Sequence, residues 1–89
     1  MTLNDLFKEW LIEQDWDEHF YELDDGPGEH RPGEFHCDMH RVAISVYKDE
    51  IVLWGQGNVR SHRFQATDPK CFNDLRMALL NYGFSLSAA

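Results

Sequence analysis

The residues best suited to chemistry stand together in the run His36-Cys37-Asp38-Met39-His40. Zinc binds imidazole nitrogen and thiolate sulfur, so His36, Cys37 and His40 form the candidate metal site of this sequence. A structural zinc site needs four ligands, usually from two separated pairs, and the second pair is not visible. In an extended chain the two histidines lie on one face and Cys37 on the other. The run therefore favours a half-buried strand edge, with a small zinc-binding module as the alternative.

The same run raises the question of catalysis. A thiol beside a histidine can be activated as a nucleophile, but neighbours in sequence seldom have the required geometry. No glycine-rich turn follows Cys37 to bind an oxyanion, and Gly55-Gln56-Gly57 lacks the further glycine and lysine of a phosphate-binding loop. We therefore expect a protein that is not an enzyme, with no catalytic residues and no cofactor.

Acidic residues dominate the first part of the chain. The 89 residues include sixteen Asp or Glu and eight Lys or Arg, which gives a net charge of −8. Residues 1–38 hold twelve acids and two bases, a net of −10, and residues 39–89 hold four acids and six bases, a net of +2. Direct binding to nucleic acid is disfavoured, because affinity for phosphate comes from Lys and Arg. Such a charge distribution favours a basic partner.

The acids between residues 15 and 34 are interleaved with aromatic residues, and this segment is the candidate partner-binding site. Carboxylates can imitate the phosphate spacing of a nucleic acid, and aromatic side chains can anchor the contact. The predicted set is Asp15, Trp16, Asp17, Glu18, Glu22, Asp24, Asp25, Glu29 and Glu34. A basic groove built for DNA or RNA is a suitable target. The alternative is that the acids only keep a small protein soluble.

In size and charge the chain resembles the small acidic proteins of phages and mobile elements, which include anti-CRISPR proteins and DNA mimics. It also resembles the bacterial immunity proteins that neutralise basic toxins. No motif carries the resemblance. It implies an inhibitor that occupies the basic, nucleic-acid-binding surface of another protein. An immunity protein, the zinc module and a self-associating structural domain are the alternatives, so a homodimer stays open.

The composition predicts one soluble, cytoplasmic domain. Hydrophobic residues make up 43% of the chain and charged residues 27%, which is enough to form a core in a chain of single-domain length. No stretch approaches about 20 apolar residues, so no membrane span is expected. The N-terminus has no basic, apolar leader, so Cys37 and Cys71 are expected to be reduced thiols in a cytoplasm.

The elements that position these groups begin with an amphipathic helix over residues 3–14, with Thr2 as N-cap and Asp5 completing a short capping box. Residues 20–23 fit either an extension of this helix or a short strand. Two Pro-Gly pairs predict a turn-rich acidic loop over about 24–34.

Alternating apolar residues over 42–47, a polar turn at 48–50 and an apolar run at 51–54 predict a β-hairpin. Residues 60–67 suggest another strand. Asp68 as N-cap and Pro69 as first residue predict a final helix that ends at Gly83, with Phe84 packing back and residues 85–89 frayed. Together these elements predict a single α+β domain over 1–89. Along the chain it has an N-terminal helix, an antiparallel sheet of three to four strands and a C-terminal helix, with the helices packed on the sheet.

Overall fold

The structure is a computed structural model of the chain, and it describes residues 2–23, 32–55 and 61–85. It has the predicted α+β class, with one helix before and one helix after the strands of an antiparallel sheet along the chain. The elements are α1 (Leu3–Glu13), the short 3-10 helix η1 (Asp17–His19), β1 (Tyr21–Glu22), β2 (Gly33–Cys37), β3 (Val42–Val46), β4 (Glu50–Gly55), β5 (Ser61–Gln65) and α2 (Cys71–Leu80).

The described sheet has five strands in the order β1-β2-β3-β4-β5, so the prediction of three to four strands was too low. The additional pairing comes from the segment that the sequence left ambiguous, because Tyr21 and Glu22 pair with His36 and Phe35 of β2. The predicted loop over 24–34 is also shorter at its end than expected, since β2 begins at Gly33. Residues 24–31 of that loop lie outside the described residues.

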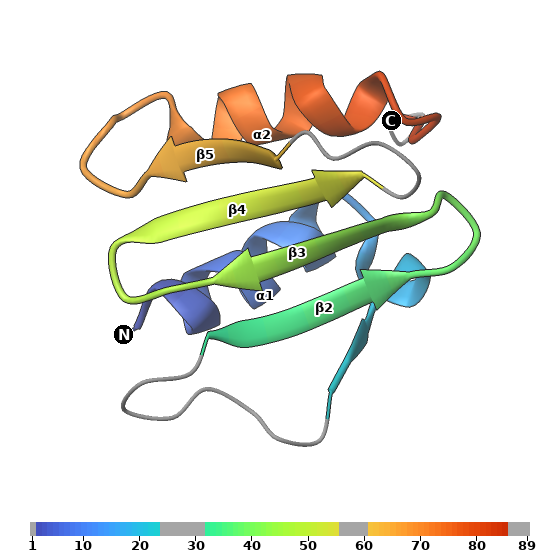
Figure 1. Cartoon of the computed structure of the whole chain (residues 1–89), viewed down its shortest axis with the longest axis horizontal. Coiled ribbons are helices and arrows are strands. Elements are labelled where there is room, and N and C mark those ends of the chain that lie inside the picture. The colour runs from blue at the N-terminus through green and yellow to red at the C-terminus, as the bar shows by residue number, and fades with distance from the viewer. Residues whose placement is uncertain (1, 24–31, 56–60, 86–89) are drawn as a thin grey trace.

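Both helices cover the same face of the sheet, and the other face is open (Figure 1). The strand residues that point toward the helices are buried and form one core with them, as Ile44 and Leu53 do with Phe7 of α1 and Leu75 of α2. The residues that alternate with them point away from both helices. The result is a two-layer domain in which one face of the sheet remains without a covering layer.

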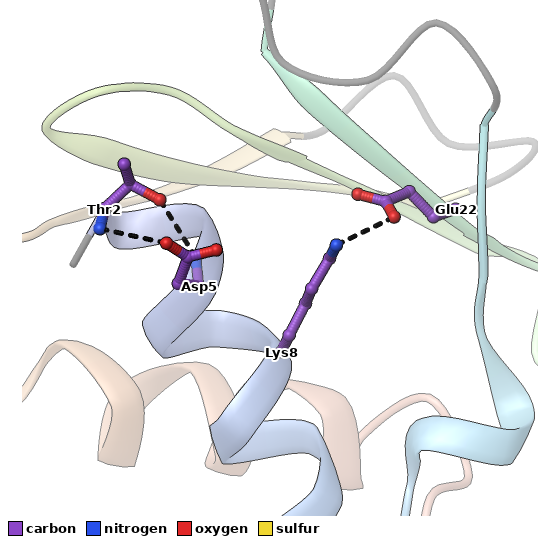
Figure 2. A network of polar contacts seen from close by, with 4 residues as sticks. All are labelled: Thr2, Asp5, Lys8 and Glu22. Carbon is purple, nitrogen blue, oxygen red and sulfur yellow. Dashed lines mark hydrogen bonds and ion pairs between the residues drawn. The ribbon is translucent and has the colours of Figure 1, made fainter.

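The predicted capping box at the start of α1 is confirmed. The Thr2 amide donates to Asp5 Oδ2 at 3.3 Å, and the Asp5 amide donates to Thr2 Oγ1 at 3.2 Å (Figure 2). These bonds satisfy two donors that the first turn of a helix otherwise leaves free. One turn further, Lys8 Nζ lies 2.9 Å from Glu22 Oε1, which ties β1 to α1 (Figure 2).

The hairpin of β3 and β4 is also confirmed. Val46 pairs with Ile51, and the Tyr47 amide donates to the Glu50 carbonyl at 2.8 Å across a turn of Lys48 and Asp49. Central position explains why residues on both faces of β4 are apolar, since this strand is paired on both edges and packed against the helices.

The second helix starts later than predicted. It begins at Cys71, and Asp68 lies three residues before it, where its Oδ1 accepts a hydrogen bond from the Lys70 amide at 2.9 Å. Gly83 ends the helix as predicted, with a left-handed φ of 96°. Phe84 packs back into the core, as expected.

The predicted fraying of residues 85–89 needs a correction at its first residue. The Ser85 carbonyl accepts a hydrogen bond from Trp16 Nε1 at 2.8 Å, which holds it against the core, and residues 86–89 lie outside the described part of the chain. None of the helices in the described ranges has the length and apolar character that a membrane crossing requires.

Candidate functional site

Four exposed carboxylates follow one another where α1 gives way to η1. They are Glu13, Asp15, Asp17 and Glu18, and we call them the acidic corner. Three of the four were predicted from the sequence as partner-binding residues. Glu13 was missed, although its place on the exposed side of the helix, two residues before Asp15, was a signal for it.

The backbone of the acidic corner is closed by a tight helix-ending motif. The Asp15 amide donates to the Ile12 carbonyl at 3.0 Å, and the Trp16 amide donates to the Leu11 carbonyl at 2.9 Å. This is the Schellman pattern, which needs a left-handed residue at the turn and usually places glycine there. Here the residue is Asp15, with φ of 63°.

Electrostatics also disfavour the position of these carboxylates. The C-terminal end of a helix carries partial negative charge, so Lys or Arg is favoured there and Asp or Glu is not. The last turn of α1 contains no basic residue, and Glu13 and Asp15 add negative charge to it. The described residues form two ion pairs, Lys8–Glu22 and Arg63–Glu50, and neither involves the acidic corner.

Trp16 was predicted as a partner-binding residue, and the structure places it in the core instead. Its side chain is 2% exposed, its ring packs 5.7 Å from that of Trp10 and 5.1 Å from that of Phe84, and its indole N–H is bonded to Ser85. The ring therefore has no surface to offer a partner. Its role is to fix the acidic corner to the core.

The remaining predicted acids do not form one surface with the acidic corner. Glu22 lies opposite Phe35, on the helix-covered side of the sheet, where it pairs with Lys8. Glu34 lies opposite Ser45 and is exposed on the open side. The sheet therefore separates these two carboxylates. Asp24, Asp25 and Glu29 lie outside the described residues.

The three candidate zinc ligands do not converge. Strand β2 ends at Cys37, so the extended run expected through residue 40 breaks into a turn. His36 points to the open side against Tyr21, with ring centroids 5.8 Å apart, while Cys37 is buried in the core. His40 stacks on Phe84 at 4.0 Å. Within the described ranges, no group of three or more His, Cys, Asp or Glu is placed to hold a metal ion.

Both cysteines are free and buried. Burial raises the pKa of the Cys71 thiol, and the nearby carboxylates of Asp68 and Asp74 raise it further. A raised pKa lowers the fraction of thiolate, which is the nucleophilic form. Cys71 is therefore a packing residue of α2.

The uncovered side of the sheet carries the other surface of interest, which we call the open face. Its described residues are Tyr21, Glu34, His36, Ala43, Ser45, Tyr47, Glu50, Val52, Trp54, Arg63 and Gln65. Ser45 and Val52 in the middle of this face are buried by their neighbours. Trp54 is 43% exposed, and its indole N–H donates to Ser45 Oγ at 3.2 Å, so the ring leans over β3.

Tyr21 lies at the rim of the open face, where its hydroxyl donates to Asp38 Oδ1 at 3.3 Å. Desolvation, followed by the Asp38 charge and this hydrogen bond, raises the pKa of the tyrosine hydroxyl. Tyr21 therefore stays a neutral hydrogen-bond donor at ordinary pH.

Comparisons with models of protein families, with curated proteins and with solved structures found no significant match. The acidic corner and the open face are therefore interpreted from their own geometry and charge.

Proposed function

We propose that this chain is a non-enzymatic acidic binding protein that occupies the basic, nucleic-acid-binding surface of another protein. Some anti-defence proteins of phages and mobile elements, among them DNA mimics and anti-CRISPR proteins, act in this way. The observation that carries the proposal is Asp15, a carboxylate held in a left-handed conformation at the negative end of a helix.

Asp15 is unfavourable for the stability of the fold in two ways. Left-handed backbone costs an L-residue up to about 1–2 kcal/mol, although Asp tolerates it better than most residues. Negative charge at a helix C-terminus costs a further ~0.3–1 kcal/mol. A local arrangement that opposes stability at a surface site is expected where the residue serves binding.

The surroundings of Asp15 favour a basic macromolecule as the partner. Asp17 and Glu18 continue the acidic corner in η1. Neither of the two ion pairs in the described part of the chain involves a carboxylate of the acidic corner. The net charge of −8 attracts a basic partner over a longer range, with a dependence on salt. Trp16 beneath the corner is locked in the core, so the carboxylates are presented on a rigid support.

The proposal places the protein in the cytoplasm, where its targets bind nucleic acid. In that compartment Cys37 and Cys71 remain thiols, in agreement with their burial as free cysteines.

A pull-down from bacterial lysate, eluted over a salt series, tests the function. The expected partner is a basic nucleic-acid-binding protein that competing DNA or RNA displaces. The variant Asp15→Asn/Asp17→Asn/Glu18→Gln should lose it at a much lower salt concentration. A control with the same charge change, Glu9→Gln/Asp49→Asn/Asp74→Asn, should retain it.

Equal retention by the two triple variants would contradict a role for the acidic corner. A captured partner that DNA and RNA do not displace would contradict the nucleic-acid mimic. If the partner is a basic toxin, the chain is instead an immunity protein that uses the same carboxylates.

A further inference from the structure

The open face has the aromatic character of an interface. Among the described residues of the open face, Tyr21, Tyr47 and Trp54 are large hydrophobic side chains that remain 47%, 39% and 43% exposed. Tyr21 belongs to β1, Tyr47 follows β3 and Trp54 belongs to β4, so the three side chains are spread across the face. Tyrosine and tryptophan are among the residues that interfaces favour.

The open face is also nearly neutral, although the chain is strongly acidic. Its described charged groups are Glu34, Glu50 and Arg63, and Arg63 lies 3.9 Å from Glu50. Contact between two copies of this face therefore brings few like charges close together, although each chain carries a net charge of −8.

The pattern across the strands is complementary to itself. In one row Ala43 of β3 lies beside Trp54 of β4. In the next row Glu34 of β2 and Arg63 of β5 stand at the two ends, with Ser45 and Val52 between them.

We propose that the open face binds a second copy of this chain, with a two-fold axis that runs parallel to the strands between β3 and β4. Such an axis places β3 of one copy over β4 of the other, and β2 of one copy over β5 of the other. Each row of side chains across the strands then faces the same row of the other copy. The bulky Trp54 of each copy then meets the small Ala43 of the other. Glu34 of each copy meets Arg63 of the other, so the axis forms two charge pairs. This surface is distinct from the acidic corner, and the inference stands without the proposed function.

The dimensions of the sheet set the size of such an interface. Strands β2 to β5 have five or six residues each, so at about 4.8 Å between strands and 3.4 Å per residue they span roughly 15–20 Å in each direction. The open face is seen in the view down the shortest axis of the molecule (Figure 1). A standard interface buries about 800 Å² per partner, so side chains around the rim of the sheet must also take part in the contact. Two sheets packed face to face lie about 10 Å apart, a distance that the side chains of the two faces fill.

Light scattering combined with sedimentation equilibrium over a wide concentration range tests the dimer. We expect a monomer–dimer equilibrium in the native chain. Glu34→Arg and Arg63→Glu should each raise the dimer dissociation constant roughly tenfold, because the symmetry repeats each lost pair. The double variant Glu34→Arg/Arg63→Glu restores opposite charges across the axis and should recover most of the affinity. Glu9→Arg on α1 makes the same charge change away from the face and should leave dimerisation intact.

Tryptophan fluorescence gives a second measurement on the unmodified protein. Trp10 and Trp16 are buried and Trp54 is exposed, so dilution of the dimer should shift the emission to longer wavelength through Trp54 alone. Trp54→Phe should abolish the shift. Circular dichroism confirms the fold of each variant. The inference would be overturned by a strict monomer at every concentration. It would also be overturned if neither single charge reversal changed the dimer dissociation constant.

Discussion

Trp16 and Phe84 pack ring against ring at 5.1 Å, and each directly follows the left-handed residue that ends its helix. The Trp16 amide bonds to Leu11, five residues back, and the Phe84 amide bonds to Leu79 in the same way, at 3.4 Å. The same closing motif therefore ends both helices and turns one aromatic ring inward from each. The two helix ends share one piece of the core, which supports the acidic corner.

Replacement of Trp16 should weaken the fold without touching the surface. Trp16→Phe removes the 2.8 Å bond to Ser85 and leaves a small cavity, so we expect the free energy of unfolding to fall by about 2 kcal/mol. Urea denaturation measures the change. Trp54→Phe is the matched control, because it removes the 3.2 Å bond to Ser45 without leaving a buried cavity, and it should cost about 1 kcal/mol or less. Equal effects of the two substitutions would mean that Trp16 is not a core residue.

The two helix-closing positions should respond to substitution in opposite directions. Asp15→Gly relieves left-handed backbone and removes a charge from the negative end of α1, so we expect a gain of about 1 kcal/mol in stability. Gly83→Ala puts a side chain where φ is 96° and a Cβ would lie 3.3 Å from His40 Nδ1, so we expect a loss of about 1 kcal/mol or more. Thermal unfolding of both variants checks the pair. A destabilised Asp15→Gly variant would remove the argument that this carboxylate opposes the fold.

The capping box predicts a specific acid sensitivity. The backbone and side-chain hydrogen bonds from Thr2 lower the pKa of the Asp5 carboxyl below its usual 3.8. A lowered pKa in the folded state contributes stability above the unfolded value, and this stability is lost as the pH falls through the folded pKa. The stability difference between the native chain and Asp5→Asn should therefore be constant near neutral pH and shrink below about pH 4. Denaturation across that range measures it, and a difference that grows in acid would contradict the assignment.

Thiol chemistry should report the burial of both cysteines. Cys37 and Cys71 lie in the core, and the raised pKa of Cys71 reduces its thiolate further. We expect both thiols to react slowly with a thiol reagent in the native protein and fast in denaturant, where two per chain should be counted. Asp68→Asn should speed the reaction of Cys71 slightly, because one of the charges that raise its pKa is removed. Rapid labelling of the native protein would show that α2 does not pack as described.

The sequence predicted best what short-range chemistry decides. Thr2 and Asp5 are three residues apart and cap their own helix, the β3–β4 hairpin follows from alternation about a polar turn, and Gly83 ends α2 because glycine adopts left-handed backbone easily. The class of the fold follows from these signals. Their common property is that each is settled within a few neighbouring residues.

Trp16 shows why part of the candidate site was not predictable. It stands between Asp15 and Asp17, so its neighbourhood in sequence is that of an exposed acidic segment. The left-handed turn at Asp15 redirects the chain, and the ring is buried by contacts with Trp10 and with Phe84, which lies near the other end of the sequence. The same holds for Gly33, which follows proline as a turn residue would but joins β2 by pairing with Val46.

The strand order has a consequence for how the chain reaches this structure. Each strand pairs with its neighbour in sequence, so the sheet can assemble stepwise, each step closing a short loop, as the chain leaves the ribosome. The last step differs, because Trp16 makes its contact with the Phe84 ring and its hydrogen bond to Ser85 only after these residues have been synthesised. We therefore expect a nascent chain that stops before α2 to hold a formed sheet with its first helix loosely docked, and synthesis of the final residues to complete folding.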